Sequence, residues 1–452
     1  MAKFKEYDIF VIGTGAAGKI VANNCAEAGL KVAIADNREF GGTCANRGCD
    51  PKKVLIGLSE IMDRAEKMKG KGIIEMPKFS WQDLMSFKDT FVNAVPASTE
   101  KALEKAGIEL YHQSPKFLDK NRLSVEGKTV NAKKIVIATG LKTLELNIPG
   151  GEFSLNSDDF LELKQLPESM IFIGAGYIGM EFAHLAARLG VKVTIIEFGP
   201  RALTNFDKYI VSFLQKASEE LGIEFIFNTK VVKIEKLPKN FRIIADQKGK
   251  QVSIDTALVI NSAGRIPSID DLDLEIGKVE FSKKGISVNE YLQSTSNKNV
   301  YACGDVSNSK GLPLTPLTSL EAKIVSGNLL NPEEPEKAKY PPLASAVFTL
   351  PNLAMVGLLE EEAKEQGFNF TIKQNKVSMW FNAKRINEPF YAFKTLVDNQ
   401  TGLILGAHLI GPEASEIINL FTLAISEKIP AKNLKNLILT YPTWGNDIKG
   451  MV

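Results

Sequence analysis

Apolar runs followed by helical patterns dominate the first half of the chain. Residues 7–12 form an apolar run that leads into a glycine-rich turn, a helical pattern and a second apolar run over 31–35. The same order recurs later, with apolar runs over 170–173 and 192–196 on either side of a glycine-rich turn and a helical pattern. Strands that alternate with helices predict parallel sheets, so each repeat predicts one α/β unit.

The rest of the chain carries other elements. Between the repeats we expect helices over 54–68 and 81–106, the second interrupted near Pro96, and strands over 108–111 and 134–137. Proline and charge without an apolar period predict a linker over 331–337. Elsewhere we expect short strands and turns over 225–260, a strand over 299–306, strands over 344–350 and 402–409, and a helix over 414–426.

The first glycine-rich turn has the spacing of a dinucleotide-binding fingerprint. Gly13 allows the tight turn, Gly15 and Ala16 let the backbone approach a pyrophosphate, and Gly18 lets the helix pack on the strand. Asp36 ends the second strand, where a carboxylate accepts a hydrogen bond from a ribose hydroxyl. The sequence therefore predicts a dinucleotide site here.

The second repeat predicts a second dinucleotide. Glu197 ends its second strand, where it can bind the ribose hydroxyls of NADH and would repel the extra phosphate of NADPH. Arg201 lies close by and leaves NADPH open as the alternative. The expected binding residues are Gly174, Gly176, Tyr177, Ile178, Gly179 and Glu197.

Composition narrows the class of protein. A chain of 452 residues is long enough for about three domains. The net charge of +2 gives no electrostatic case for nucleic acid, and no apolar run of about 18 residues predicts a membrane span. The polar N-terminus does not read as a signal peptide, so we expect a cytoplasmic protein.

Two of the four cysteines, Cys44 and Cys49, lie five positions apart. On an ideal helix their Cα atoms would be roughly 8–9 Å apart, beyond the reach of a disulfide, so a bridge needs irregular backbone, which Gly48 permits. Asp50 and Pro51 predict a helix start, with Asp50 as N-cap. That would place Cys49 at the positive end of a helix, where a thiolate is favoured.

These residues alone leave two interpretations of the cysteine pair. It is either a redox-active dithiol or two unrelated buried thiols. In a reducing compartment a disulfide is more often catalytic than structural. The other two cysteines, Cys25 and Cys303, lie in apolar patterns and are expected to be packing residues. Asp305, in the turn after Cys303, could hold a cofactor hydroxyl.

Taken together, these motifs resemble the two-dinucleotide disulfide reductase family, which includes glutathione reductase, dihydrolipoamide dehydrogenase and mercuric reductase. The resemblance covers essentially the whole chain. It rests on the two fingerprints, the cysteine block 41–53, the turn Ala138, Thr139 and Gly140, the turn Gly264, Arg265, Ile266 and Pro267, the turn Ala302, Cys303, Gly304 and Asp305, and the linker-separated tail. It favours the redox-active interpretation of the cysteine pair.

The resemblance implies an α/β fold with two Rossmann-like dinucleotide-binding domains, for FAD and NAD(P), and an α+β C-terminal dimerisation domain. The implied divisions are a first FAD-binding part at 1–150, an NAD(P)-binding domain at 151–267, a second FAD-binding part at 268–337 and an interface domain at 338–452, through which the chain forms a homodimer. No metal site is implied. The residues assigned to cofactors by resemblance also include Gly42, Thr43, Lys53, Ala138, Thr139, Gly140, Gly264, Arg265, Gly304 and Asp305.

The resemblance also implies roles at the dithiol. Cys49 matches the thiol nearer the flavin, and Cys44 matches the thiol that attacks substrate. Lys52 matches a lysine near the reactive flavin nitrogen, and Glu181 its ion-pair partner. Tyr177 matches an aromatic residue that shields the flavin until the nicotinamide enters.

The tail departs from the family pattern. The best-known members of the family carry His-Pro-Thr-x-x-Glu, in which the histidine moves protons at the substrate thiol, whereas this chain has Tyr441 and Asn446 at those positions. Tyrosine ionises near pH 10 in model peptides, so it is a poor base at neutral pH. The three histidines, His112, His184 and His408, are expected to be structural.

The expected activity is that of an NAD(P)H-dependent flavoprotein disulfide reductase. Electrons would pass from the nicotinamide through flavin to Cys44 and Cys49 and on to a small-molecule disulfide. Because the histidine is missing, a reductase for metal ions or quinones and a redox sensor of low turnover remain as alternatives. Arg47 is either a substrate-facing cation that lowers a cysteine pKa or a surface arginine.

Overall fold

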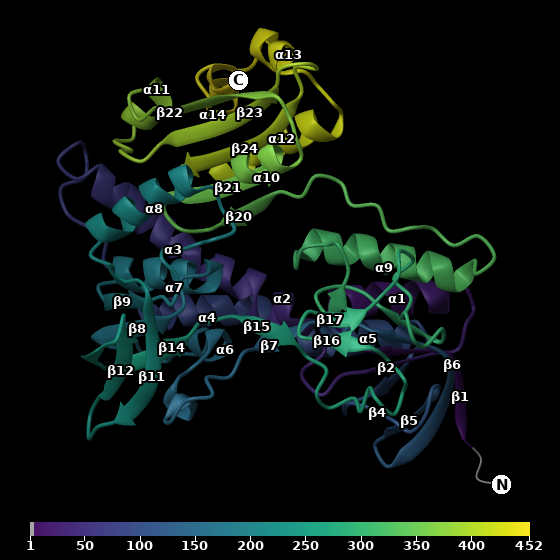
Figure 1. The fold of residues 1–452 in the computed structure, drawn as a ribbon. Coiled ribbons are helices and arrows are strands. Elements are labelled where there is room, and N and C mark those ends of the chain that lie inside the picture. Colours follow the sequence, from purple (N-terminus) through teal and green to yellow (C-terminus); the bar gives the residue numbers. More distant parts are fainter. Residues whose placement is uncertain (1–3) are drawn as a thin grey trace. The chain divides into compact units, whose positions relative to one another are not determined.

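The computed structural model describes residues 4–452 and contains two compact units, each assembled from separate stretches of chain (Figure 1). The first unit contains the chain up to residue 53, residues 86–144 and residues 265–340. The second contains residues 54–85, 145–264 and 341–452. The helices α3 (Cys49–Lys67) and α4 (Trp81–Val92) belong partly to each unit. The finer four-part division of the chain stays a prediction.

The main sheet of the first unit has the strand order β3-β2-β1-β6-β5-β4, with β18 beside β6. Its centre is parallel, and β4 and β5 add an antiparallel edge. The elements of this unit are β1 (Lys5–Ile12), α1 (Ala16–Glu27), β2 (Val32–Ala35), α2 (Gly42–Arg47), α5 (Val95–Lys105), β3 (Glu109–Tyr111), β4 (Lys116–Phe117), β5 (Arg122–Val125), β6 (Lys128–Ile137), β7 (Leu141–Thr143), β15 (Arg265–Pro267), β16 (Phe281–Ser282), β17 (Gly285–Ser287), β18 (Val300–Ala302), β19 (Ser307–Asn308) and α9 (Thr315–Leu330).

One expectation for this unit was only partly right. The strand expected over 134–137 begins at Lys128, because the first half of β6 pairs with β5 in a hairpin and alternates polar with apolar residues. The strand expected within 299–306 runs into a turn at Gly304 and Asp305 as predicted, and it ends at Ala302. The helix expected over 81–106 is interrupted as predicted, with α4 ending at Val92 and α5 beginning at Val95.

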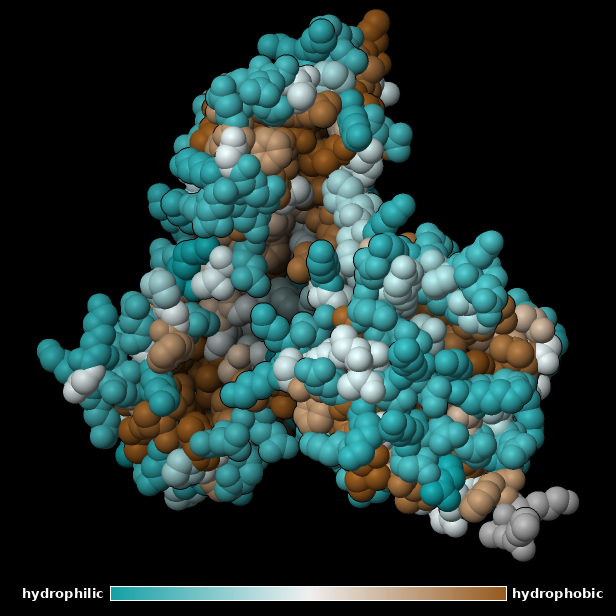
Figure 2. Space-filling view, turned by 45° about the vertical axis from the view of Figure 1, so that its right-hand side comes forward, coloured by the Kyte–Doolittle hydropathy of each residue, from teal (hydrophilic) through white to brown (hydrophobic). Residues whose placement is uncertain are grey.

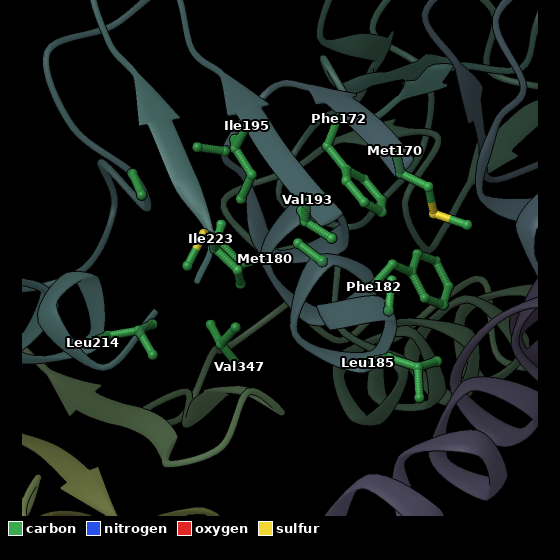
Figure 3. Close-up of a cluster of buried hydrophobic side chains, with 14 of the residues drawn as sticks. Met170, Phe172, Met180, Phe182, Leu185, Val193, Ile195, Leu214, Ile223 and Val347 are labelled. Atoms are coloured by element: carbon green, nitrogen blue, oxygen red, sulfur yellow. The ribbon is translucent and has the colours of Figure 1, made fainter. Parts of the chain in front are cut away.

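The second repeat folds as a parallel sheet of order β10-β9-β8-β14, beside an antiparallel sheet β11-β12-β13. Figure 3 shows its apolar core, in which Phe172 and Ile195 from the strands lie near Phe182 and Leu185 from α7. Its elements are η1 (Gly151–Phe153), α6 (Ser157–Phe160), β8 (Ser169–Ile173), α7 (Tyr177–Arg188), β9 (Lys192–Ile196), α8 (Lys208–Glu220), β10 (Glu224–Ile226), β11 (Thr229–Lys236), β12 (Phe241–Gln247), β13 (Lys250–Thr256) and β14 (Leu258–Asn261).

The tail forms an antiparallel sheet of order β20-β21-β24-β23-β22 with helices packed against it. Both expected strands and the expected helix are present, while the three strands β21, β22 and β23 were not predicted. The residues of β22 are mostly polar and lie at the sheet edge. The elements are β20 (Ser345–Val347), β21 (Asn352–Gly357), α10 (Glu360–Glu365), β22 (Phe370–Lys376), α11 (Phe381–Lys384), β23 (Ala392–Asp398), β24 (Ile404–Gly411), α12 (Ala414–Ser426), α13 (Ala431–Asn436) and α14 (Trp444–Met451).

A buried group of charges joins this tail to α8 within the second unit. Lys394, whose side chain is 2% exposed, lies 2.8 Å from the Oδ2 of Asp207 and 2.6 Å from the Oε2 of Glu360. Asp207 also caps α8 by accepting from the backbone nitrogens of Tyr209 and Ile210. Burying a lysine is costly unless its charge is matched, so these two carboxylates hold it in place.

Two of the three histidines are buried in structural hydrogen bonds. The Nε2 of His184 lies 2.8 Å from the hydroxyl of Ser218, and burial lowers the pKa of His184 to about 3. The Nε2 of His408 lies 3.1 Å from the carbonyl of Leu358, and its pKa is also lowered by burial. A buried imidazole that stays neutral is a poor proton carrier near neutral pH.

The surface is mainly hydrophilic. Figure 2 shows polar side chains over most of one face, with smaller apolar patches between them. In the tail, large apolar side chains are exposed at Met379, Phe381, Leu420, Leu423, Leu437 and Ile438. Among residues 4–452, every helix is too short or too polar to cross a membrane.

Candidate active site: a dithiol at a dinucleotide cavity

The first fingerprint forms the turn that the spacing predicts. The Oδ2 of Asp36 accepts hydrogen bonds from the backbone nitrogen of Thr14, at 2.8 Å, and from its hydroxyl, at 2.6 Å. A Cβ on Gly18 would lie 1.8 Å from the carbonyl oxygen of Gly13, so α1 can pack against the turn only with glycine here. These contacts fix the conformation of the turn at the amino end of α1, where backbone N–H groups favour the binding of a phosphate.

The helix that carries Cys44 lies directly against this turn. Gly42, the first residue of α2, has φ of 76°, and a Cβ there would lie 2.3 Å from the Cα of Gly15. The Nδ2 of Asn46 donates to the carbonyls of Phe40, at 3.0 Å, and Gly42, at 3.1 Å, which fixes the entry to the helix. Cys44 is therefore two residues after Gly42, the residue that touches the dinucleotide turn.

The two cysteines lie on consecutive helices. Gly48, with φ of −139° and ψ of −117°, breaks the chain between α2 and α3, which is the irregular backbone expected there. The prediction that Asp50 caps the helix is wrong, because α3 already begins at Cys49 and Asp50 lies in its first turn. Gly48 is the only residue between α2 and α3, so no further residue is left between them to cap α3. Cys49 is therefore at the amino end of α3, as predicted.

One hydroxyl contacts both thiols. The Oγ1 of Thr315 lies 3.6 Å from the Sγ of Cys44 and 3.9 Å from the Sγ of Cys49, and both cysteines are free. Thr315 is the first residue of α9, which packs along α1. The two thiols and the Thr315 hydroxyl thus come from the first residues of three helices, α2, α3 and α9.

The surroundings of Cys44 and Cys49 give the two thiols different pKa values. A hydrogen bond from Cys44, the Thr315 hydroxyl and the Lys52 charge together lower the pKa of Cys49 to about 6, against the opposing effect of burial. The hydrogen bond to Cys49, burial and the charge of Cys49 raise the pKa of Cys44. The charge of Asp50 raises both pKa values. Near neutral pH, the reduced pair therefore holds its first negative charge on Cys49.

A cavity of about 360 Å³ lies beside the dithiol within the first unit. The hydroxyl of Thr139 is buried in its wall without a hydrogen-bond partner, so a polar ligand atom is needed to satisfy it. The lining carries both signs of charge. Its cations are Arg38, Arg47, Lys142 and Arg265, and its carboxylates are Asp36, Glu39, Asp270, Asp271 and Asp305. The predicted residues that line it are Gly13, Gly15, Ala16, Asp36, Gly42, Thr43, Cys44, Ala138, Thr139, Gly140, Arg265, Gly304 and Asp305. This lining fits FAD.

Arg47 is not a surface arginine. Its side chain is 10% exposed, and its Nη2 lies 2.5 Å from the Oε2 of Glu39. Both residues line the cavity. The charge of Arg47 is therefore matched by Glu39 at the cavity wall.

A buried carboxylate shapes the far wall of the cavity. Glu321, 2% exposed, accepts hydrogen bonds from the backbone nitrogen of Gly304, at 2.7 Å, and from the hydroxyls of Ser309, at 2.6 Å, and Tyr340, at 2.8 Å. It thereby fixes the turn that carries Asp305. Burial raises the pKa of Asp305, and the charge of Arg265 opposes this effect.

The second fingerprint repeats this construction within the second unit. The Oε2 of Glu197 accepts from the backbone nitrogen of Ala175 at 2.7 Å, and its Oε1 accepts from that of Gly199 at 2.6 Å. A Cβ on Gly179 would lie 2.2 Å from the carbonyl oxygen of Gly174. Glu197 therefore holds this turn as Asp36 holds the first.

Several predicted residues lie outside the cavity lining. Lys52 and Lys53 follow Cys49 on α3, and Gly18 supports the turn from behind. Glu181, 2% exposed, accepts from the backbone nitrogen of Phe348. The remaining predicted residues of the second unit are Gly174, Gly176, Tyr177, Ile178, Gly179, Glu197, Gly264 and Tyr441. The roles of Glu181, Tyr177 and Tyr441 at the dithiol stay predictions.

Sequence reasoning missed Thr315 and Glu321. Both lie on α9, which was not predicted although Pro316 follows Thr315 at the helix start, a recognisable signal. Nothing in the residues around Glu321 indicates that its carboxylate is buried. Within residues 4–452, no group of three His, Cys, Asp or Glu side chains is placed to hold a metal ion.

Two dinucleotide turns, one with a dithiol at its cavity, define a flavoprotein disulfide reductase. The profile of the pyridine nucleotide-disulphide oxidoreductase family matches residues 7–322, and that of the family's dimerisation domain matches residues 343–452. The chain belongs to this family. It is an FAD-dependent enzyme that uses NAD(P)H and acts on sulfur groups.

Relatives of known activity span almost the whole chain. Glutathione reductase of Nostoc sp. is 32% identical, with 97% of each chain covered. Dihydrolipoyl dehydrogenase of Staphylococcus aureus is 31% identical, covering 97% of this chain and 94% of the relative. The solved structure of the HOCl-induced flavoprotein disulfide reductase RclA from Escherichia coli has a TM-score of 0.87 at 27% identity, covering 98% of this chain and 99% of that chain.

Bound FAD supplies a carrier that accepts a hydride from a nicotinamide and delivers its electron pair to a disulfide. The residues that would hold it are those that line the cavity around Thr139 and Asp36. The chain's own contribution is to keep Cys49 as a thiolate and to hold both thiols against Thr315.

Proposed function

We propose that this enzyme passes an electron pair from NADH, through Cys49 and Cys44, to a disulfide acceptor. The observation that supports this most strongly is the pair of thiols bridged by Thr315, with Cys44 in the wall of the cavity and Cys49 the more acidic thiol. Because one hydroxyl contacts both thiols and the two thiols differ in pKa, the pair is suited to gain and lose two electrons as one unit.

The exchange proceeds in two steps. Cys44 first gives its proton to the thiolate of Cys49 and then, as the thiolate, attacks one sulfur of the acceptor disulfide. This forms a mixed disulfide and releases the other half as a thiolate, which takes the proton back from Cys49. The thiolate of Cys49 then attacks the Sγ of Cys44, closes the protein disulfide and releases the second half. The acceptor gains two electrons, and the dithiol loses two.

The cofactor preference rests on Glu197 and Arg201. The guanidinium of Arg201 donates to the carbonyls of Ala202, Leu203, Thr204 and Phe206, at 2.7–3.1 Å. Because the guanidinium of Arg201 already donates to these four carbonyls, it is not available to pair with the extra phosphate of NADPH. Glu197 would repel that phosphate, so we propose that NADH is preferred.

This preference predicts a lower KM for NADH than for NADPH in steady-state assays. Glu197→Ala is expected to raise the KM for NADH about tenfold, because a hydrogen bond to a charged group is worth about 1.5–3 kcal/mol. Glu220→Ala, which changes an exposed acid at the end of α8, serves as the control. A lower KM for NADPH in the wild-type enzyme would refute the proposal.

The remaining roles follow the family. We propose that Cys49 faces the flavin, that Lys52 and Glu181 form an ion pair at its reactive nitrogen, and that Tyr177 shields it before the nicotinamide enters. The exposed apolar side chains of the tail, among them Met379 and Ile438, support a homodimer through this domain. We also propose a cytoplasmic location.

Tyr441 stands where relatives carry the histidine, and its ring is 70% exposed. If its hydroxyl donates a proton or orients the acceptor, Tyr441→Phe should lower kcat/KM for a disulfide about tenfold without changing the rate of flavin reduction by NADH. Tyr291→Phe is the matched control. An unchanged kcat/KM would show that the tyrosine is only structural.

A second candidate acceptor is the cupric ion. The structural neighbour RclA has also been solved as a Cu(II) complex, at 27% identity and a TM-score of 0.87. Metal reduction needs no histidine to protonate a leaving thiolate. A stopped-flow comparison of reduced enzyme with glutathione disulfide, lipoamide and Cu(II) ranks the acceptors by reoxidation rate. Fastest reoxidation by Cu(II), persisting after Tyr441→Phe, would replace the disulfide proposal.

A further inference from the structure

The stretch that follows α9, residues 331–340, is docked on the first unit, and we refer to it as the connecting segment. The side chain of Asn328, which is 2% exposed, accepts from the backbone nitrogen of Glu336 at 2.6 Å and donates to its carbonyl at 3.0 Å. The backbone nitrogen of Ala338 donates to the carbonyl of Glu290 at 2.8 Å. Backbone hydrogen bonds therefore fix the connecting segment almost to its end.

Tyr340, the last residue of the connecting segment, contacts α9 through a buried acid. Its hydroxyl donates to the Oε1 of Glu321 at 2.8 Å. Burial raises the pKa of Tyr340 to about 12, so the hydroxyl keeps its proton near neutral pH. Glu321 and Asn328 are seven positions apart on α9, and the connecting segment therefore follows one face of this helix.

The carboxylate that accepts from the connecting segment also holds a wall of the flavin cavity. The Oε2 of Glu321 accepts from the backbone nitrogen of Gly304 at 2.7 Å and from the hydroxyl of Ser307 at 3.2 Å. Gly304 and Asp305 line the cavity, and the hydroxyl of Thr318 donates to the Oδ1 of Asp305 at 3.4 Å. Because hydrogen bonds to one buried carboxylate reinforce one another, the donors on its two oxygens depend on each other.

We propose that Tyr340 is a positioning residue of the FAD site. Through Glu321 it holds the turn of Gly304 and Asp305 in the form that binds FAD. FAD binding and the docking of the connecting segment therefore favour each other, and each strengthens the other by the same factor. This coupling does not depend on which acceptor the enzyme reduces, so it goes beyond the proposed function.

The directions of these hydrogen bonds predict which substitutions keep the coupling. In Glu321→Gln, the amide oxygen can replace Oε2 and accept from the nitrogen of Gly304. The amide nitrogen then donates to the hydroxyls of Ser309 and Tyr340, which can accept as well as donate. In Glu321→Leu, the nitrogen of Gly304 and the hydroxyl of Tyr340 both lose this partner. The Gln variant should therefore keep the FAD site, and the Leu variant should lose it.

The first test measures the Kd of FAD from the flavin that is retained on ultrafiltration across a dilution series of holoenzyme. Tyr340→Phe removes a hydrogen bond to a charged group and should raise this Kd about tenfold. Glu321→Gln should stay close to the wild-type Kd, and Glu321→Leu should exceed Tyr340→Phe. Tyr291→Phe is the control, because the ammonium of Lys337 in the connecting segment lies 5.8 Å from the centre of the Tyr291 ring. This variant keeps the ring and should keep the wild-type Kd.

The second test measures the reciprocal effect by limited digestion with trypsin. Lys339 is exposed and directly precedes Tyr340, so cleavage after it reports the opening of the connecting segment. Wild-type enzyme that has been diluted until its FAD dissociates should be cut there about tenfold faster than the same enzyme with saturating FAD, because the coupling is reciprocal. In Tyr340→Phe the two rates should be equal. Cleavage after Lys248, an exposed residue between β12 and β13, is the control and should not depend on FAD.

Three results would overturn the proposal. One is a wild-type Kd for FAD in Tyr340→Phe, and another is cleavage after Lys339 that is equally fast with and without FAD in the wild-type enzyme. The third is a Glu321→Gln enzyme that binds FAD as weakly as Glu321→Leu, because positioning through the hydrogen bonds would then fail. The digestion of wild-type enzyme needs no variant, so it decides the matter even where Tyr340→Phe does not fold.

Discussion

Replacement of Cys44 by serine is expected to lower kcat/KM for disulfide reduction roughly 1,000-fold or more, because a hydroxyl cannot form the mixed disulfide. The reduction of flavin by NADH should persist, since the dinucleotide turns do not involve this thiol. Stopped-flow absorbance separates the two half-reactions: the first is followed at the flavin band and the second by reoxidation with the acceptor.

Cys25→Ala is the matched control, since Cys25 is a buried thiol in α1 whose pKa is raised by burial alone. It should reduce disulfides at nearly the wild-type rate. A Cys44→Ser enzyme that still reduced the acceptor at the wild-type rate would mean that electrons leave directly from flavin. The dithiol would then be a bystander.

Replacement of Lys394 by methionine is expected to destabilise the second unit by about 3–5 kcal/mol, because it leaves two carboxylates buried or partly buried without their cation. The side chains of Lys394 and Asp207 are 2% and 1% exposed, and that of Glu360 is 18% exposed. Urea unfolding of wild-type and variant enzyme at pH 7 measures the difference. Asp207 would remain as the cap of α8 with its charge unmatched.

The neighbouring pair Lys208 and Glu361 provides a control. Both side chains are more than half exposed, and Lys208→Met should leave the unfolding midpoint unchanged. If Lys394→Met unfolds at the same urea concentration as Lys208→Met, the buried group contributes nothing.

The effect of Lys394→Met should shrink in acid. Hydrogen bonds from Lys364 and Lys394 hold the pKa of Glu360 at about 2, below its usual 4.5. A lowered carboxylate pKa stabilises the fold above pH 4.5, and this stabilisation is lost as the pH falls towards 2. Unfolding at pH 3 should therefore show a smaller difference between variant and wild type than at pH 7.

The sequence predicted the dinucleotide turns and the dithiol well, because glycine spacing and cysteine spacing act over a few residues. Gly13, Gly18 and Asp36 lie where local backbone requirements put them. The break at Gly48 follows from the same kind of requirement. The start of α3 was placed wrongly because the chain enters it directly from α2 without a separate cap.

The residues of the site that the sequence did not predict depend on contacts between positions far apart in the chain. Thr315 contacts thiols that are 266 and 271 positions away, and nothing near it distinguishes it from other helix-starting threonines. The sequence pattern around Glu321 is that of an acid on the surface of a helix. Its actual place depends on the hydrogen bonds that it accepts from Gly304 and Tyr340.

The assembly of the first unit from three stretches has a consequence for how the protein is made. Val300 in β18 pairs with Ile135 in β6, so the flavin-binding sheet is complete only after about 160 further residues have been synthesised. At 5–20 residues per second this takes roughly 10–30 s on the ribosome. Asp305 and Thr318 line the FAD cavity. We therefore expect FAD to bind only after these residues have been synthesised.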